Sequence, residues 1–197
     1  LTTLTAVAAD ASDIDVTSLI FKGTNSIGTN ITTSMDLTSG LGSTVTVGLT
    51  EETNGTAQTM DLITLSGLGA FSITGGDADI NVTEIDATAA TGAVTLDFGT
   101  AIDNAMTITL GDTTTGLTSN DVSTGSGADD ITGGSGADTI NSGDGADTII
   151  AGAGNDAINA GDGTDDIDMG AGNDTLTFST GHGGDADTID GGAGTDT

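Results

Sequence analysis

Aspartate recurs at every ninth residue in the C-terminal part of this chain, and carboxylates at a fixed spacing are the ligands that hard divalent cations prefer. The recurring residues are Asp129, Asp138, Asp147, Asp156, Asp165 and Asp174. They occupy the sixth place of six consecutive blocks that cover residues 124–177 without a gap: TGSGADDIT, GGSGADTIN, SGDGADTII, AGAGNDAIN, AGDGTDDID and MGAGNDTLT. The spacing therefore predicts a repeated cation site.

The other places of the block indicate the elements that carry these aspartates. The second and fourth places are always glycine, and the eighth is always Ile or Leu. Strand side chains alternate between faces, so a short strand centred on the eighth place turns that aliphatic side chain inward. Glycine tolerates the close backbone approach and positive φ of a tight turn. Two turns return the chain to its starting face, so we predict a coil of about 18 residues, twice the nine-residue block.

Coils of this kind stack about 4.7–4.9 Å apart, which places aspartates of alternate blocks above one another. Asp129, Asp147 and Asp165 form a first column, and Asp138, Asp156 and Asp174 form a second column. Neighbouring carboxylates at that separation repel by about 3.5 kcal/mol at an effective dielectric constant near 20. A calcium ion between two oxygens spans about 4.6–5.2 Å, whereas magnesium spans about 4.0–4.2 Å. The spacing favours calcium.

Residues 124–177 resemble the calcium-binding β-roll of RTX (repeats-in-toxin) proteins, which Gram-negative bacteria secrete. The resemblance implies an all-β, right-handed parallel β-helix or β-roll solenoid. It also implies that each ion lies between turns of neighbouring coils, held by two aspartates and by backbone carbonyls of the glycine turns. Four interior Ca²⁺ sites follow: Asp129 with Asp147, Asp147 with Asp165, Asp138 with Asp156, and Asp156 with Asp174.

The phase of the repeat breaks after Leu176, where FSTGHGG is inserted before the pattern restarts with GGAGTDT at Gly191. We expect Asp187 over Asp165 and Asp196 over Asp174 as further metal ligands at the end of the roll. Because the last block stops before its aliphatic place, we expect the protein to continue. First-place glycine is kept only in the second block, and its replacements are expected to weaken individual turns. Three additional turn residues are expected to face solvent: Asp144, Asp162 and Asp185.

Composition supports a cation as part of the fold and excludes several functions. Thirty acidic residues against one basic residue give a formal charge of -29, so neither nucleic acid nor an anionic membrane surface is expected as a partner. The sequence contains no run of 18 apolar residues, which is the length needed to span a membrane. Cysteine is absent and aromatic residues make up 2%. A chain so charged and so poor in large apolar side chains is expected to need something beyond apolar burial to fold.

The preceding part of the chain predicts β-structure with a less regular period. Alternating runs such as Thr44–Leu49 and Ala93–Phe98 are separated by Gly, Asn and Asp. Residues 1–61 are predicted as a β-rich segment that a β-sandwich or a β-helix would fit, residues 62–123 as an irregular parallel β-helix, and residues 124–197 as the β-roll. The segment TGLTSNDVS, residues 115–123, is in phase with the repeat, with Asn120 in the aspartate place, and predicts a degenerate joining coil.

No catalytic arrangement emerges from the sequence, and we expect no enzyme activity. The zinc-protease motif HExxH would need two histidines, and only His182 is present. The GxSxG elbow of esterases is missing. The motif GGDAD occurs at Gly75–Asp79 and Gly183–Asp187 and fits either a further calcium corner or an ordinary β-turn.

Two functions are consistent with these features. The first is a structural extracellular protein similar to RTX-type surface-layer (S-layer) proteins, whose roll folds and assembles on calcium into a lattice or filament at the bacterial cell surface, with cell-surface polysaccharide as a further partner. The alternative is a calcium-dependent folding and secretion module of a larger RTX adhesin, toxin or hydrolase exported by type I secretion. In both, low cytosolic calcium would leave the roll unfolded until export, because binding free energy is folding free energy.

Overall fold

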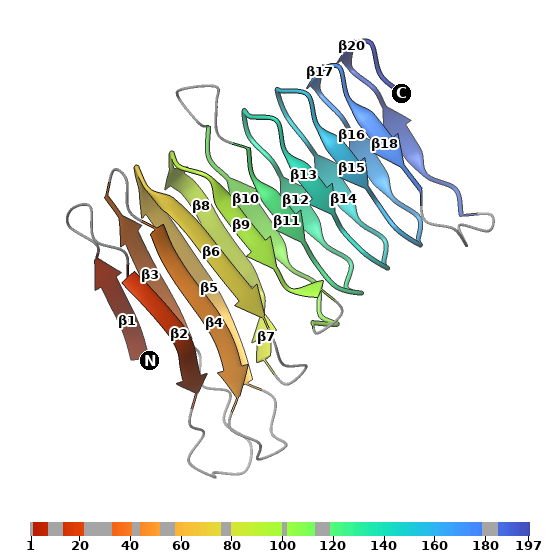
Figure 1. Ribbon diagram of the computed structural model, residues 1–197. Helices are drawn as coiled ribbons and strands as arrows, with labels where there is room; N and C mark the ends of the chain where they lie inside the picture. Colours follow the sequence, from red (N-terminus) through yellow and green to blue (C-terminus); the bar gives the residue numbers. More distant parts are fainter. Residues whose placement is uncertain are drawn as a thin grey trace.

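The computed structural model describes residues 2–7, 14–21, 33–40, 44–51, 58–75, 80–99, 102–112, 119–178 and 185–197, and within these ranges the side chains from Met35 onward except those of residues 50, 51, 58, 59 and 80. The described residues form a continuous stack of coils that runs from one chain terminus to the other (Figure 1). His182, most of the first GGDAD motif and the start of the TGLTSNDVS segment lie outside the described residues.

One face of every coil contributes a strand to a ten-stranded sheet. Its order is β1-β3-β5-β8-β10-β12-β14-β16-β19, with β7 paired to β5. All of these pairs are parallel. The strands are β1 (Thr2–Val7), β3 (Thr33–Ser39), β5 (Gln58–Gly67), β7 (Ile80–Val82), β8 (Glu84–Ala90), β10 (Thr107–Leu110), β12 (Asp130–Thr132), β14 (Thr148–Ile150), β16 (Asp166–Asp168) and β19 (Thr188–Asp190).

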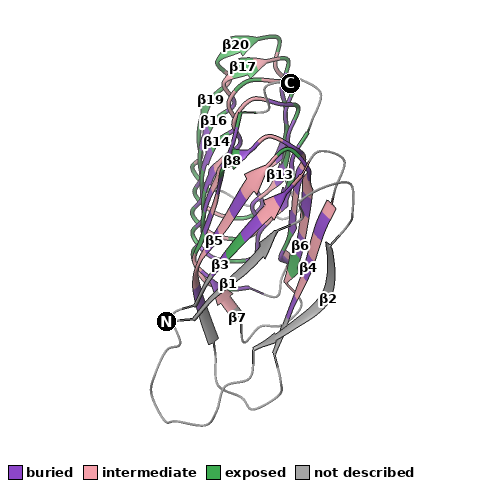
Figure 2. Ribbon diagram, turned by 90° about the vertical axis from the view of Figure 1, so that its left-hand side faces the viewer, coloured by how far each residue is buried: buried purple, intermediate pink, exposed green. Residues whose placement is uncertain are grey.

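The opposite face contributes an eight-stranded parallel sheet in the order β18-β15-β13-β11-β9-β6-β4-β2. Figure 2 shows the two sheets facing each other with buried residues between them. The strands are β2 (Ile14–Phe21), β4 (Thr44–Glu51), β6 (Ala70–Gly75), β9 (Val94–Asp97), β11 (Asp121–Ser123), β13 (Thr139–Asn141), β15 (Ala157–Asn159) and β18 (Thr175–Thr177). A small third sheet pairs β17 (Ala171–Gly172) with β20 (Ala193–Gly194).

The described strands within residues 1–61 join the same solenoid. Strands β1 and β2 pair in parallel with β3 and β4, and these pair with β5 and β6. Strand β5 crosses from residue 61 to residue 62 without a break. Parallel strands connected through alternate sheets build a β-helix, whereas β-sandwiches are antiparallel, so the sandwich alternative does not describe these strands.

The core changes in character along the stack. The long strands β3 to β6 each turn several apolar side chains inward, including Val45, Val47 and Leu49 on β4. Strands β12 to β16 of the roll bury one aliphatic side chain each, whereas Leu176 on β18 is partly buried and Ile189 on β19 is 47% exposed. Ile131 pairs in register with Ile149, which pairs with Ile167. The β-helix therefore has a broad apolar core, whereas the roll has a thin one and depends more heavily on the chemistry of its turns.

Replacing Ile149 tests how much the roll relies on this thin stack. The side chain is 0% exposed and is held between Ile131 and Ile167. We expect Ile149→Ala to lower the free energy of unfolding of the calcium-loaded protein by about 2–5 kcal/mol, because the short strands cannot collapse into the cavity. Ile150, its neighbour on β14, is 43% exposed and provides the control. Chemical denaturation measures both variants, and equal losses would contradict the inward stack.

Candidate metal centre

The six repeated aspartates are buried, although free carboxylates normally lie at the surface. Each follows a glycine turn and directly precedes a strand of the roll, and each is only 1–2% exposed: Asp129, Asp138, Asp147, Asp156, Asp165 and Asp174. The third-place residues Asp144 and Asp162 are exposed, and so is Asp185, as expected. Within the described part of the roll, therefore, only the sixth-place carboxylates enter the interior.

Backbone N–H groups hold the aspartates in two ladders. In the first column, the N–H of Asp129 donates to Oδ1 of Asp147 at 2.8 Å, and the N–H of Asp147 donates to Oδ1 of Asp165 at 2.9 Å. In the second column, the N–H groups of Asp138 and Asp156 donate to Oδ1 of Asp156 and Asp174, both at 2.8 Å. The partners are 18 residues apart, as predicted for one coil, and one oxygen of each carboxylate is fixed by the backbone of the coil before it.

Both columns continue past the break in the repeat. The N–H of Asp165 donates to Oδ1 of Asp187, and the N–H of Asp174 donates to Oδ1 of Asp196, each at 3.0 Å and 22 residues away. Strand β19 keeps its register with β16, since Ile167 pairs with Ile189. Although 22 residues rather than 18 separate these partners, both columns continue, with Asp187 next to Asp165 and Asp196 next to Asp174.

The second oxygen of the carboxylates provides the test of a cation. The Oδ2 atoms of Asp129, Asp138, Asp147, Asp156 and Asp174 are buried and accept no hydrogen bond. A Cβ placed on Gly133 would lie 2.9 Å from Oδ2 of Asp138 and would overlap the carbonyl oxygen of Ala151 in the next coil. Two acceptor oxygens thus flank a space that glycine leaves open. Buried acceptors without donors are costly, and a bound cation would satisfy both.

The residues fit calcium better than a metal that needs a closed set of side-chain ligands. Among the described residues, no three His, Cys, Asp or Glu side chains converge on one point. Two carboxylates from stacked coils and the carbonyls of the glycine turns would supply hard oxygen ligands, which calcium accepts in flexible geometries. When bound, the ion would neutralise the columns and tie adjacent coils together.

Glycine at the fourth place is required by the stacking itself. Gly163 has φ of +154°, and a Cβ there would overlap the carbonyl oxygen of Gly145 in the coil before. It would also lie 3.2 Å from Oδ1 of Asp165. The absent side chain lets the two turns approach each other and lets the carboxylate fold back over its own turn.

Burial raises the pKa of several column carboxylates. For Asp138, burial raises the pKa to about 6, against the lowering effect of the Asn120 N–H, and the negative charge of Asp156 adds to the rise. For Asp147, burial again raises the pKa to about 6, while the N–H of Asp129 and the hydroxyl of Ser142 lower it. Burial also raises the pKa of Asp129 and Asp156 above the ordinary value. Without metal, the folded roll binds protons more strongly than the unfolded chain does.

Acid is therefore expected to replace calcium in part. A folded-state pKa above the unfolded value of 3.8 gives stability that is present at low pH and is lost as pH rises through about 6. Asp138 and Asp147 should each stabilise the metal-free roll at pH 5 relative to pH 7.5, by on the order of 1 kcal/mol. With calcium present the sign reverses, because protons compete for the ligands. Circular dichroism in chelator at both pH values measures the first effect, and identical spectra would contradict it.

Sequence reasoning missed several polar contacts inside the columns. The Thr124 hydroxyl donates to the carbonyl of Ser142 at 2.7 Å, and the Ser142 hydroxyl donates to the carbonyl of Ala160 at 2.8 Å. These first-place residues were expected only to weaken their turns. Instead they supply donors to carbonyls that would otherwise face acceptors, and the departure from glycine at these places was the only sequence signal.

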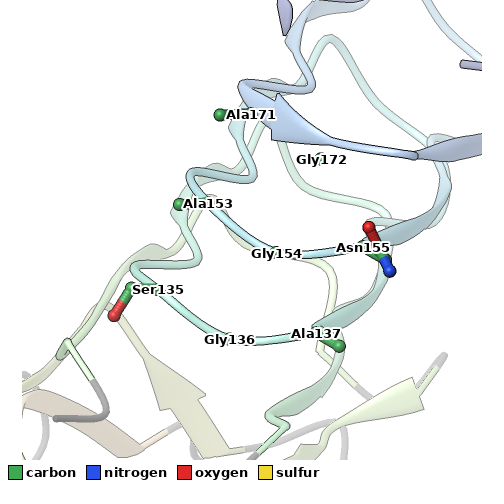
Figure 3. Close-up of a pocket in the computed structure, with 8 residues that line it drawn as sticks. All are labelled: Ser135, Gly136, Ala137, Ala153, Gly154, Asn155, Ala171 and Gly172. Carbon is green, nitrogen blue, oxygen red and sulfur yellow. The ribbon is translucent and has the colours of Figure 1, made fainter. Parts of the chain in front are cut away.

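The two columns of turns also differ on their outer surface. Beside the second column, Ser135, Ala153 and Ala171 stack above one another next to a groove whose floor is Gly136, Gly154 and Gly172 (Figure 3). Beside the first column, the corresponding places include the exposed residues Asp144 and Asp162, which are bridged in parallel. From Ser135 onward, the third places beside the second column are therefore uncharged, whereas those beside the first column carry exposed aspartates.

Comparison with known families agrees with this geometry. Residues 114–149, 141–176 and 183–197 match a family model described as the RTX calcium-binding nonapeptide repeat (4 copies). The matched segments cover the coils that carry the aspartate columns. Comparison with curated proteins gave no match, and comparison with solved structures gave none either. No helix among the described residues is long and apolar enough to cross a membrane.

Proposed function

Because the C-terminal part of the chain is an RTX calcium-binding β-roll, we propose that the protein is a structural component of a bacterial cell surface, folded and assembled by external calcium. The observation that carries the proposal is the pair of buried aspartate columns, in which the Oδ2 atoms of residues such as Asp147 and Asp156 accept no hydrogen bond. At neutral pH such columns require a cation. Extracellular calcium modules bind with dissociation constants of about 10⁻⁴–10⁻³ M, so the roll would fold after export.

The ligand set proposed is Asp129, Asp147, Asp165 and Asp187 in the first column and Asp138, Asp156, Asp174 and Asp196 in the second. Neighbours in each column would share an ion, which gives four interior sites and two end sites. The hydrogen bonds between coils support this order, because each aspartate contacts the next one in its column.

Self-association is supported by an uneven distribution of charge. On the ten-stranded sheet, the outward residues of the roll include Asp130, Asp166, Asp168 and Asp190. On the eight-stranded sheet, the outward residues of β13, β15 and β18 are uncharged: Thr139, Asn141, Ala157, Asn159, Thr175 and Thr177. In a chain of charge -29, this neutral face is where two copies can approach without repulsion.

Assembly can be tested on the purified 197-residue chain. We expect oligomers or ordered arrays by light scattering and electron microscopy in millimolar calcium, and their loss in chelator. Replacing Asn141 and Asn159 together with Asp should abolish assembly and leave calcium binding intact, whereas Thr148→Asp on the acidic face is the matched control. A chain that stays monomeric in millimolar calcium would overturn the structural role.

The second candidate function, a folding and secretion module of a larger secreted protein, is supported by the same family match. It shares calcium-dependent folding and extracellular location but does not require assembly. A calcium-folded monomer would therefore favour it. Neither candidate assigns catalysis to this chain, and binding of cell-surface polysaccharide stays a prediction.

A further inference from the structure

Asn120 occupies the aspartate place of the coil that precedes the second column. Its side chain is 2% exposed. Its Oδ1 accepts a hydrogen bond from the N–H of Val94 at 3.0 Å, and its own N–H donates to Oδ1 of Asp138 at 2.9 Å. The Oδ1 ladder of the column thus begins one coil before the first aspartate, with an amide in place of a carboxylate.

The second polar atom of the side chain, Nδ2, distinguishes Asn120 from the aspartates that follow it in the column, which have Oδ2 at this position. Its Nδ2 donates to the carbonyl oxygen of Gly133, in the next coil, at 3.5 Å. One coil further on, Oδ2 of Asp138 lies at the equivalent place beside the carbonyl of Ala151 and has no donor. The amide therefore supplies a positive hydrogen where the later coils leave two acceptors facing each other.

The first column has its own donors at the same end of the roll. The hydroxyls of Thr124 and Ser142 donate to first-place carbonyls of the following coils. From residue 151 onward, the first places are Ala151, Ala160 and Met169, which carry no hydroxyl. The chain's own donors are concentrated where the roll meets the β-helix.

We propose that Asn120 closes the second column without metal and that residues 119–128 form a calcium-independent root on which the roll folds. This rests on the proposed binding of calcium between the aspartates. The Asn120 amide takes the place of a cation at Gly133, so the first ion of this column lies between Asp138 and Asp156. The root is continuous with the apolar core, because Val122 belongs to the same buried cluster as the β-helix residues.

A root of this kind gives folding a direction. Each coil of a solenoid contacts only its neighbours, so stability is a sum of coil and interface contributions. Coils that need no metal stay folded and present a template, and each calcium ion then fixes one further coil. Calcium would close the roll from residue 129 toward residue 197.

Converting the amide to a carboxylate should create a new site. We expect Asn120→Asp to raise the number of calcium ions bound per 197-residue chain by one, measured by isothermal titration calorimetry and by metal analysis after gel filtration. Asn155→Asp makes the same chemical change at an exposed turn position, where Oδ1 already accepts the N–H of Asn173. It should leave the number unchanged. An unaltered number in Asn120→Asp would overturn the proposal.

Hydrogen exchange of the unsubstituted chain in chelator provides a second test that needs no variant. The N–H of Val94 bonds to Asn120, and the N–H of Phe98 bonds to the carbonyl of Ser123. These amides should exchange at least about tenfold more slowly than those of Asp166 and Thr175, which belong to later coils. Equal exchange would reject the root. If the unsubstituted chain bound no calcium at all, the proposed function would fail instead.

Discussion

In calcium-free buffer at neutral pH, the full chain is expected to lose the β-structure of its roll, and calcium should restore it where magnesium does not. Strands β12 to β16 of the roll bury only one aliphatic side chain each, while the roll also buries carboxylates such as those of Asp147 and Asp156, whose second oxygen accepts no hydrogen bond. Without a cation, repulsion within the columns and unsatisfied acceptors outweigh this small apolar gain.

Titration with magnesium tests whether the roll responds to calcium specifically or to any divalent cation. The backbone hydrogen bonds between coils fix the separation of the turns, for example 2.8 Å from the N–H of Thr148 to the carbonyl of Asp129. An ion that spans about 4.0–4.2 Å between oxygens, and holds its water tightly, cannot join turns stacked about 4.7–4.9 Å apart as calcium can.

Circular dichroism titrated separately with the two ions measures this effect. The β-helix should keep its signal throughout, because strands β3 to β10 enclose an apolar core that needs no metal. A roll that stays compact in metal-stripped buffer, or that responds equally to magnesium, would contradict the role of the columns.

Replacing Asp147 with Ala should remove about twice the calcium-dependent stability that replacing Asp129 removes. Asp147 lies between Asp129 and Asp165 and would contribute to two ions. Asp129 is the first aspartate of its column, and the N–H that donates to its Oδ1 comes from Met106, which has no carboxylate, so Asp129 would contribute to one ion. At 10 mM calcium, a site with a dissociation constant of 10⁻⁴–10⁻³ M stabilises the fold by about 1.4–2.7 kcal/mol. Loss of two sites should therefore cost about 3–5 kcal/mol.

The second column offers the same comparison between Asp156 and Asp138. Asp156 contacts aspartates on both sides, whereas Asp138 follows Asn120. Asp144→Ala, an exposed aspartate in the turn that precedes Asp147, controls for the change in net charge. Chemical denaturation at fixed calcium gives the four values. Equal losses at shared and terminal positions would contradict ion sharing.

The strict period made the roll predictable from sequence. In a stacked solenoid the sequence repeat is the structural repeat, so the nine-residue spacing alone assigns Asp129 to Asp174 to two columns and places Ile131, Ile149 and Ile167 in one inner stack. The pairing of Asp187 with Asp165 could also be foreseen, because the repeat pattern resumes after the inserted residues.

Other features could not be predicted because they depend on contacts rather than on period. Alternating strands in residues 1–61 suit a sandwich and a β-helix equally, and only the pairing of β1 and β2 decides between them. Asn120 was recognised in the aspartate place, but the direction of its amide toward Gly133 depends on the neighbouring coil. The hydroxyl contacts of Thr124 and Ser142 depend on the neighbouring coil in the same way.

The ladder of contacts between coils also determines how the molecule would respond to mechanical load. Because partners in the roll are 18 residues apart, a pulling force on the C-terminus would peel one coil at a time. Each coil released would lengthen the chain by roughly 55–60 Å, since an extended residue spans about 3.3–3.6 Å. The roll would then act as an extensible tether that yields coil by coil, at a force that rises with the calcium concentration of its surroundings.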